Sequence, residues 1–179
     1  MFSSRQARGV WAVLSSALVA LMVFGSIGAP PARADEPPQW GALYTDSYYF
    51  GSIYANGGDA QLKSQSCYAG CYDYQRWYSI VKPTRSPSGH KLIQLKSYLN
   101  SRCIDDNAAA AGGAAWLRGC NSGDYQVWEV FPIGSTKFVF KSWGAWTLQS
   151  RHLCLKASGN PGVVKMTTCD TGNDAQRWS

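Results

Sequence analysis

The chain has 179 residues, of which 13% are aromatic and only 16% are charged, and its formal net charge is +6. This composition excludes an intrinsically disordered chain, because such chains are rich in charge and poor in aromatic residues. Arg5, Arg8 and Arg33 precede every acidic residue, and without them the balance is 14 basic against 11 acidic residues, a net charge of +3. So small an excess does not indicate nucleic-acid binding, which normally requires a concentrated basic face.

The N-terminal segment has the three-part pattern of an export signal. Arg5 and Arg8 precede an almost wholly apolar run from Val10 to Gly28. Pro30-Pro31 then breaks any helix, and Ala32-Arg33-Ala34 offers small residues at the positions that a signal peptidase reads. The alternative is an uncleaved anchor, since about 19 apolar residues just span a bilayer. The proline pair and the cleavage pattern favour removal.

The mature protein is therefore predicted to be secreted, extracellular and without a membrane span. Removal of a signal peptide over residues 1–34 leaves 145 of the 179 residues. A chain of this size supports one hydrophobic core and not two. We expect an N-terminal extension over residues 35–44 and a single domain over residues 45–179.

All six cysteines follow the signal: Cys67, Cys71, Cys103, Cys120, Cys154 and Cys169. An even number in an exported chain indicates disulfides, although six cysteines allow 15 pairings and their number does not choose among them. A zinc site is the alternative use. The sequence has no C-x-x-C pair, and its two histidines, His90 and His152, lie at no ligand-like spacing. We therefore predict neither a metal site nor a cofactor.

Along the mature chain, short strand patterns alternate with turns. Tyr48, Phe50 and Tyr54 follow a period of two, which favours a core-facing strand, whereas Trp40, Tyr44 and Tyr49 are candidates for a partner-binding platform. Residues 92–98 and 138–143 also alternate apolar side chains at period two. Segments rich in Gly, Pro, Asn or Ser separate them at residues 83–89, 107–115, 121–124, 133–135 and 157–162. No useful helix is predicted outside the signal, so the pattern indicates an all-β barrel or sandwich.

A tripeptide motif, Q-x-W, recurs three times: Gln75-Arg76-Trp77, Gln126-Val127-Trp128 and Gln176-Arg177-Trp178. Successive glutamines are 51 and 50 residues apart, which indicates three structural repeats with pseudo-threefold symmetry. Two cysteine pairs recur at similar spacing, because Cys120 follows Cys103 by 17 positions and Cys169 follows Cys154 by 15. Before its first cysteine, repeat three has six more residues than repeat two, and this longer segment contains Trp143 and Trp146. These two tryptophans are expected either to form a contact loop or to be buried.

With these motifs the chain resembles the ricin-B-type β-trefoil family. The resemblance also rests on Cys103-Ile104-Asp105 and its counterpart Cys154-Leu155-Lys156, and it covers about residues 45–179, more weakly in the first repeat. It implies an all-β trefoil of twelve strands, with a six-stranded barrel closed by three hairpins. It implies disulfides Cys103–Cys120 and Cys154–Cys169, which leaves Cys67 and Cys71 to pair with each other. It also implies structural roles for the motif residues, with each Trp in the core and each Gln bonded to a neighbouring loop: Gln75, Trp77, Gln126, Trp128, Gln176 and Trp178.

Lectins of this family bind galactose-like sugars in shallow pockets, at most one per repeat. Each pocket uses the Asp of a C-ϕ-D element, which is a Cys, an apolar residue and an Asp in succession. It also uses an aromatic residue two positions before the second cysteine, and usually an Asn before the Gln of Q-x-W. Repeat three has Lys156, Thr167 and Ala175 at these positions, and repeat one has no C-ϕ-D element. The resemblance therefore implies that neither of these repeats binds sugar in the usual manner.

Repeat two keeps the acid as Asp105, but Arg118 and Tyr125 replace the aromatic residue and the Asn. Trp116 lies two residues before Arg118, on the same face of a strand, and can supply the missing ring. The alternative is that Asp105 is a loop acid bonded to its own backbone. The candidate ligand-binding residues are Asp105, Asp106, Asn107, Trp116, Arg118, Tyr125 and Gln126.

These residues bear on three classes of function. An enzyme is not predicted, because the chain has no nucleophile, metalloprotease or phosphate-binding motif. We expect a secreted, non-catalytic binding module for a galactose-like glycan, acting through the second repeat. The alternative is an adaptor for a separate secreted protein, or a cell-binding subunit of a toxin-like assembly similar to the cytolethal distending toxins, whose sugar sites have been lost.

Overall fold

The computed structural model describes residues 40–43, 52–54, 60–65, 73–108, 110–159 and 161–179. All of them belong to the unit Ala32–Ser179, which is separate from the unit Met1–Pro31. The predicted signal peptide, Cys67, Cys71 and the aromatic residues from Tyr44 to Phe50 lie outside the described residues. Within the described part of the chain, no helix has the length and apolar character needed to cross a membrane.

Three repeats follow one another, and each ends in a short 3-10 helix that finishes at the glutamine of a Q-x-W motif. The first contains β1 (Trp40–Ala42), β2 (Ser52–Tyr54), β3 (Ala60–Gln61), β4 (Lys63–Gln65) and η1 (Asp73–Gln75). The second contains β5 (Arg76–Arg85), β6 (Lys91–Ser97), β7 (Arg102–Asp105), β8 (Trp116–Gly119) and η2 (Asp124–Gln126). The third contains β9 (Trp128–Ile133), β10 (Lys137–Ser142), α1 (Trp143–Gln149), β11 (Leu153–Lys156), β12 (Gly162–Val163), β13 (Lys165–Thr168) and η3 (Asp174–Gln176).

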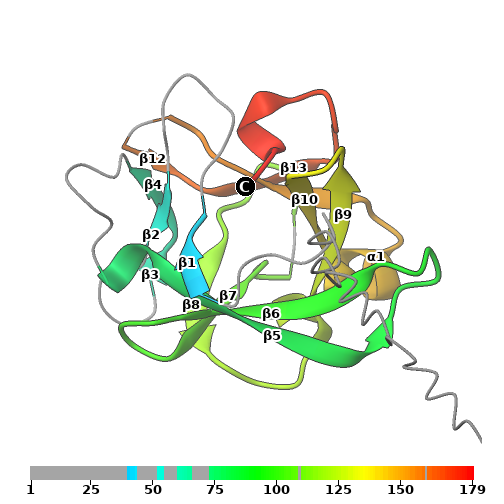
Figure 1. Cartoon of the computed structure of the whole chain (residues 1–179), viewed down its shortest axis with the longest axis horizontal. Coiled ribbons are helices and arrows are strands. Elements are labelled where there is room, and N and C mark those ends of the chain that lie inside the picture. The colour runs from blue at the N-terminus through cyan, green and yellow to red at the C-terminus, as the bar shows by residue number, and fades with distance from the viewer. Residues whose placement is uncertain (1–39, 44–51, 55–59, 66–72, 109, 160) are drawn as a thin grey trace, which may run out of the picture. The chain divides into compact units, whose positions relative to one another are not determined.

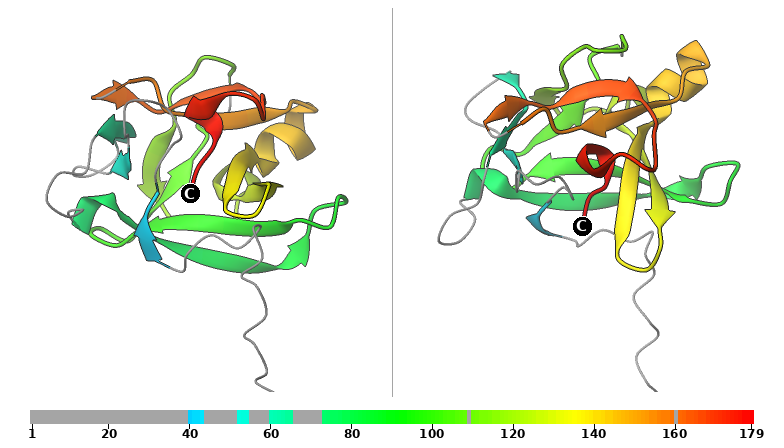
Figure 2. Two further views of the ribbon diagram at one scale, coloured as in Figure 1. Left: turned by 45° about the horizontal axis from the view of Figure 1, so that its top comes forward. Right: turned by 90° about the horizontal axis from the view of Figure 1, so that it is seen from above.

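Strands from successive repeats join into one antiparallel run, β1–β5–β6–β9–β10 (Figure 1). The motif tryptophans mark its register, because Trp77 lies opposite Ser97 and Trp128 lies opposite Ser142. A bridge between Phe138 and Trp178 brings the third motif to the same run. Outside this run, each repeat contributes one further antiparallel pair, β2 with β4, β7 with β8 and β11 with β13 (Figure 2).

A ring of three backbone hydrogen bonds joins the repeats. Leu62 donates to the carbonyl of Ala115, Ala115 donates to that of Val164, and Val164 donates to that of Leu62, all at 2.9 Å. All three residues are fully buried. One equivalent residue of each repeat takes part in this ring, so the pseudo-threefold symmetry indicated by the Q-x-W spacing is present in the structure.

The core is built around the motif tryptophans. Trp77, Trp128 and Trp178 are at most 1% exposed. The indole N–H of Trp128 donates to the carbonyl of Ile104, and that of Trp178 donates to the equivalent carbonyl of Leu155. The predicted trefoil fold is thus confirmed, as are the Cys103–Cys120 and Cys154–Cys169 disulfides. Thirteen strands, rather than twelve, occur among the described residues, and two of them, β3 and β12, are only two residues long.

The prediction that no helix follows the signal is wrong, because the extra length of repeat three forms α1. The Ser142 hydroxyl caps the helix by accepting a hydrogen bond from the Ala145 N–H at 2.9 Å. The helix ends at Ser150, which has a left-handed conformation. Its seven residues have little intrinsic tendency to form a helix, so the cap and the packing described below stabilise it.

Candidate functional site

The carboxylate of Asp105 lies at the end of β7 and is only 7% exposed. One oxygen accepts a hydrogen bond from the Asn107 N–H at 2.7 Å, which makes the local turn that was the alternative interpretation of this residue. The other oxygen lies 3.2 Å from the Gln126 amide nitrogen. Asp105 and Gln126 are therefore in contact, and both lie at the base of the predicted repeat-two site.

The motif glutamines also serve the scaffold. Gln126 donates to the carbonyl of Gly119 and accepts from the Asn121 N–H, both at 2.9 Å. Gln176 makes the same pair of bonds to Thr168 and Asp170, also at 2.9 Å. Since this arrangement persists in repeat three without an Asp partner, the backbone contacts of these two glutamines are structural, as the resemblance implied.

Asp106 faces away from the predicted ligand surface and is 1% exposed. Its carboxylate accepts a hydrogen bond from Ser142, the same hydroxyl that caps α1, and its N–H donates to the carbonyl of Tyr125 at 3.0 Å. The residue thereby joins the repeat-two loop to the start of α1. This placement indicates a structural role.

Helix α1 lies against η2 of the second repeat. The Gln149 amide donates to the carbonyl of Ala108 at 2.8 Å and lies 3.5 Å from the Tyr125 hydroxyl. Thr147 donates to Asp124 at 3.1 Å. The additional segment of repeat three therefore forms one wall of the repeat-two site, on the side where the family pattern has an Asn.

This contact requires a glycine at position 144. A Cβ atom there would lie 2.5 Å from Cδ1 of Tyr125 and 2.8 Å from its backbone nitrogen. We expect Gly144→Ala to lower the free energy of unfolding by about 1–3 kcal/mol, because overpacking forces neighbouring atoms apart. Urea denaturation measures this change. Gly119→Ala is a matched control, since nothing lies within 4 Å of its added Cβ; equal losses for the two variants would contradict this packing.

Three of the predicted residues form a group at the surface. The Arg118 guanidinium donates to the Asn107 side-chain oxygen at 2.6 Å and lies 5.8 Å from the centre of the Trp116 ring. Asn107 and Arg118 are exposed and Trp116 is half-buried. Trp116 lies opposite Asp105 in the β7–β8 ladder. The structure therefore brings together a ring, a cation, an amide and, at their base, the Asp105 carboxylate.

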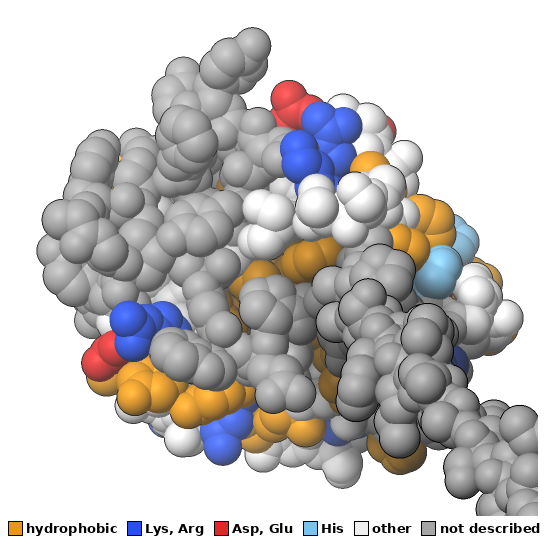
Figure 3. All heavy atoms as spheres, viewed as in Figure 1, with side chains coloured by type: hydrophobic (Ala, Val, Ile, Leu, Met, Phe, Trp, Pro, Cys, Tyr) orange, Lys and Arg blue, Asp and Glu red, His pale blue; other side chains and the backbone are white. Residues whose placement is uncertain are grey.

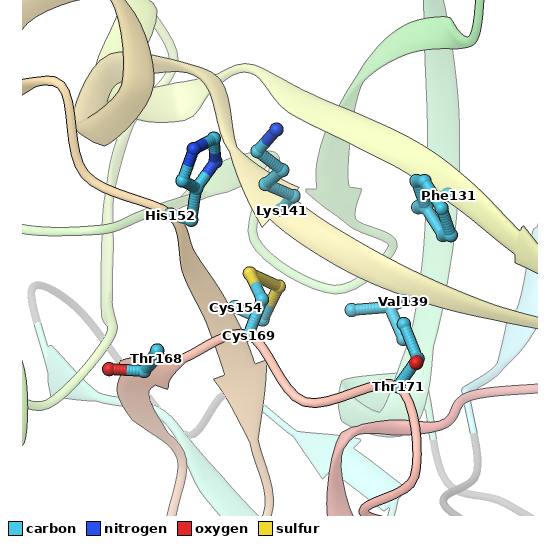
Figure 4. Close-up of a pocket in the computed structure, with 8 residues that line it drawn as sticks. All are labelled: Phe131, Val139, Lys141, His152, Cys154, Thr168, Cys169 and Thr171. Carbon is cyan, nitrogen blue, oxygen red and sulfur yellow. A yellow bond between two sulfur atoms is a disulfide. The ribbon is translucent and has the colours of Figure 1, made fainter. Parts of the chain in front are cut away.

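A second site, which the sequence did not reveal, is a pocket of about 400 Å³ between the β9–β10 hairpin and the end of repeat three (Figure 4). Its floor includes the Cys154–Cys169 disulfide, and its lining residues come from β9, β10, β11 and β13 and the segments that flank them: Phe131, Val139, Lys141, His152, Thr168 and Thr171. No short motif joins these segments, so only the fold assembles the pocket.

A charged cluster supports one edge of this pocket. The buried Glu129 carboxylate lies 2.9 Å from Nδ1 of His90 and 3.2 Å from Nζ of Lys141. Burial by itself would raise the pKa of Glu129, but hydrogen bonds from Ser86 and His90 and the charge of Lys141 outweigh it and hold that pKa below its usual value. Glu129 is therefore ionised at neutral pH and fixes the position of Lys141.

An exposed apolar patch lies on the β5–β6 side, where Figure 3 shows hydrophobic side chains interspersed with basic ones. It comprises four residues that are 38–54% exposed: Tyr78, Ile80, Tyr98 and Leu99. Val81 is also exposed but lies on the opposite face of β5. The rings of Tyr78 and Tyr98 lie 5.7 Å apart. Six basic residues and a single acid, Asp73, occur between residues 73 and 102. The small net charge of the predicted mature chain therefore conceals a strongly basic segment.

Comparison with known proteins agrees with this architecture. Residues 91–179 match the family described as the ricin-type beta-trefoil lectin domain. No curated protein matched the chain in sequence. The designed threefold-symmetric protein ThreeFoil is 15% identical with a TM-score of 0.63, and the match covers 78% of this chain and 96% of that one.

Two natural proteins have the same fold. The Haemophilus ducreyi cytolethal distending toxin is 15% identical with a TM-score of 0.54, over 84% of this chain and 85% of that one. A Polyporus squamosus lectin, bound to a sialylated influenza-binding epitope, is 18% identical with a TM-score of 0.59, over 80% of this chain and 49% of that one. At these identities the likeness is one of fold. The fold and the paired disulfides define a stapled β-trefoil.

Within that class, the match over repeats two and three identifies the family. Residues 91–179, in repeats two and three, belong to the ricin-type β-trefoil lectin family. Domains of this family are binding modules.

Proposed function

We propose that this protein is a secreted, non-catalytic module that binds carbohydrate through its second repeat. The observation that carries the proposal is the convergence of Asp105, Asn107, Trp116 and Arg118 at one end of β7 and β8. Repeat three has Lys156 where repeat two has Asp105, and Thr167 where repeat two has Arg118. Repeat two is therefore the better candidate of these two repeats.

The chemistry of this surface suits a sugar. An aromatic ring packs against the apolar face of a pyranose, and an amide with a guanidinium bonds its hydroxyls. The carboxylate of Asp105 accepts the two hydrogen bonds described above, and carboxylate oxygens offer about four acceptor positions in all. It therefore retains capacity for a sugar hydroxyl that reaches the base of the site. The wall formed by α1 limits the ligand to the Trp116–Arg118 side.

A glycan-array screen of the mature protein tests this proposal. We expect a galactose-like hit whose affinity falls about 10- to 100-fold in Asp105→Ala, as for the loss of a charged hydrogen bond. Trp116→Ala should weaken the same hit without removing the buried turn at Asp105. Lys156→Ala is the matched control from repeat three and should leave binding unchanged. Binding that survives both repeat-two substitutions in folded protein would contradict the assignment.

The second candidate function is a protein-binding adaptor, and the β5–β6 patch favours it. Exposed apolar side chains that gather on one side mark interaction surfaces on soluble proteins, and Tyr is a favoured interface anchor. Under this alternative, the array gives no hit and a secreted partner co-purifies with the mature protein. Replacement of Tyr78 and Ile80 by serine then releases the partner.

A further inference from the structure

The pocket of about 400 Å³ described above, called here the Phe131 pocket, adjoins a second hollow, and the two are together called the groove. The second hollow, of about 530 Å³, is lined by Ala110, Ala111, Arg151 and Leu153 and shares His152 and Thr168 with the first. A ligand that fills the pocket can therefore continue along the chain past His152. None of these residues belongs to the repeat-two group, and none is Lys156, Thr167 or Ala175, the repeat-three positions of the family's sugar site.

The walls of the pocket are held in place before any ligand arrives. Phe131 is 37% exposed, yet its ring packs edge-on against His90 with 4.8 Å between ring centres. The His152 ring stacks on Trp146 at 4.6 Å, and Lys141 lies over the same indole at 5.1 Å. In Figure 4 the disulfide lies near the centre of the labelled side chains, between Thr168 and Val139. Side chains fixed in this way lose little freedom when a ligand binds.

The lining selects the kind of ligand. The pocket is bounded by a phenyl ring, a disulfide, a valine and two threonines, together with Lys141 and His152. No carboxylate or side-chain amide is among the residues that line the pocket, and these are the groups that hold sugar hydroxyls in pairs. An apolar side chain therefore fits this pocket better than a sugar ring does. Pockets of this kind receive the large anchor residues that dominate protein interfaces.

The charged side chains that line the groove are basic, although Lys141 is paired with Glu129, which lies outside the lining. Among the twelve residues that line the two hollows, Lys141 and Arg151 are cationic, His152 is a histidine and none is acidic. Asp170 follows Cys169 in the chain but does not line the pocket, and its side chain accepts from the Gly172 N–H at 2.9 Å. The groove thus complements a negatively charged segment.

From these observations we propose that the groove binds an acidic, extended segment of a separate protein, with one large apolar side chain inserted between Phe131 and the Cys154–Cys169 disulfide and acidic residues beside His152 and Arg151. The inserted side chain supplies most of the affinity. The acidic neighbours select the partner. The residues that line the groove are distinct from those proposed to bind carbohydrate in repeat two.

Selection of a phage-displayed random peptide library on the immobilised mature protein tests the proposal. We expect enrichment of peptides with an aromatic or branched aliphatic residue next to Asp or Glu. The synthetic form of an enriched peptide should bind at least tenfold more weakly when its apolar residue becomes alanine, and also when its acids become lysine. Fluorescence polarisation measures both effects. Failure to enrich such peptides would overturn the proposal.

Variants locate the bound peptide. Thr171→Trp fills the pocket from an exposed position and should weaken peptide binding at least tenfold. Thr84→Trp, at an exposed position on β5, adds the same side chain elsewhere and should change nothing. Equal peptide affinity in the two variants would refute the site. If Thr171→Trp instead removes glycan binding and leaves peptide binding intact, the pocket is a carbohydrate site and the proposal is wrong.

Discussion

Replacement of Trp128 by alanine should lower the free energy of unfolding by about 3–5 kcal/mol. The indole is fully buried, its N–H donates to the carbonyl of Ile104, and its strand joins β6 of the preceding repeat. The substitution removes apolar contacts, leaves a cavity in the shared core and removes the indole N–H that donates to the Ile104 carbonyl. Urea denaturation of the mature protein gives the value directly.

Trp116→Ala is the matched control for this substitution, because it removes the same side chain from a half-buried position on β8. We expect its effect on stability to be clearly smaller than that of Trp128→Ala, while its effect on glycan binding should be larger. Normal stability with lost ligand binding in Trp128→Ala would overturn the structural role given to the motif tryptophans.

The second large effect concerns the Cys154–Cys169 disulfide. Replacement of both cysteines by alanine should lower the free energy of unfolding by about 2–5 kcal/mol, since the bond restricts the unfolded chain over a 15-residue separation. Removal of both sulfurs avoids a reactive free thiol. The measurement is the denaturation midpoint of the oxidised mature protein.

The equivalent double substitution at Cys103 and Cys120, which are 17 residues apart, should cost a similar amount because the two bonds occupy matching places in their repeats. An unchanged melting temperature after loss of either bond would contradict its contribution to stability. Loss of the Cys154–Cys169 bond should also weaken peptide binding in the groove, because this disulfide forms its floor.

The fold was predictable because the trefoil repeats its structural signals. The Q-x-W glutamine ends a 3-10 helix in every repeat, and the tryptophan enters the core each time. Recurrence of one motif at near-equal spacing is typical of a protein built from structural repeats. The ring formed by Leu62, Ala115 and Val164 has no such signal, because ordinary apolar residues make it through their backbone.

The site was only partly predictable. The family resemblance implied that Asp105 and Gln126 share one site, but it did not show that Asp105 is nearly buried or that Asp106 bonds Ser142. Helix α1 was missed because its formation depends on the Ser142 cap and on Gly144 packing against Tyr125, both tertiary effects. The groove depends on segments far apart in the sequence, which no local pattern connects.

The central claim is that this trefoil binds sugar through the second repeat, and a nuclear magnetic resonance titration tests it most directly. Methyl β-galactoside is added at millimolar concentration to ¹⁵N-labelled mature protein. We predict chemical-shift changes that concentrate at Asp105, Asn107, Ala108 and Trp116–Arg118. In the Asp105→Ala variant, the sugar should cause no chemical-shift change at these positions. Changes confined to the Phe131 pocket or to the β5–β6 patch, or the absence of any change, would contradict the claim.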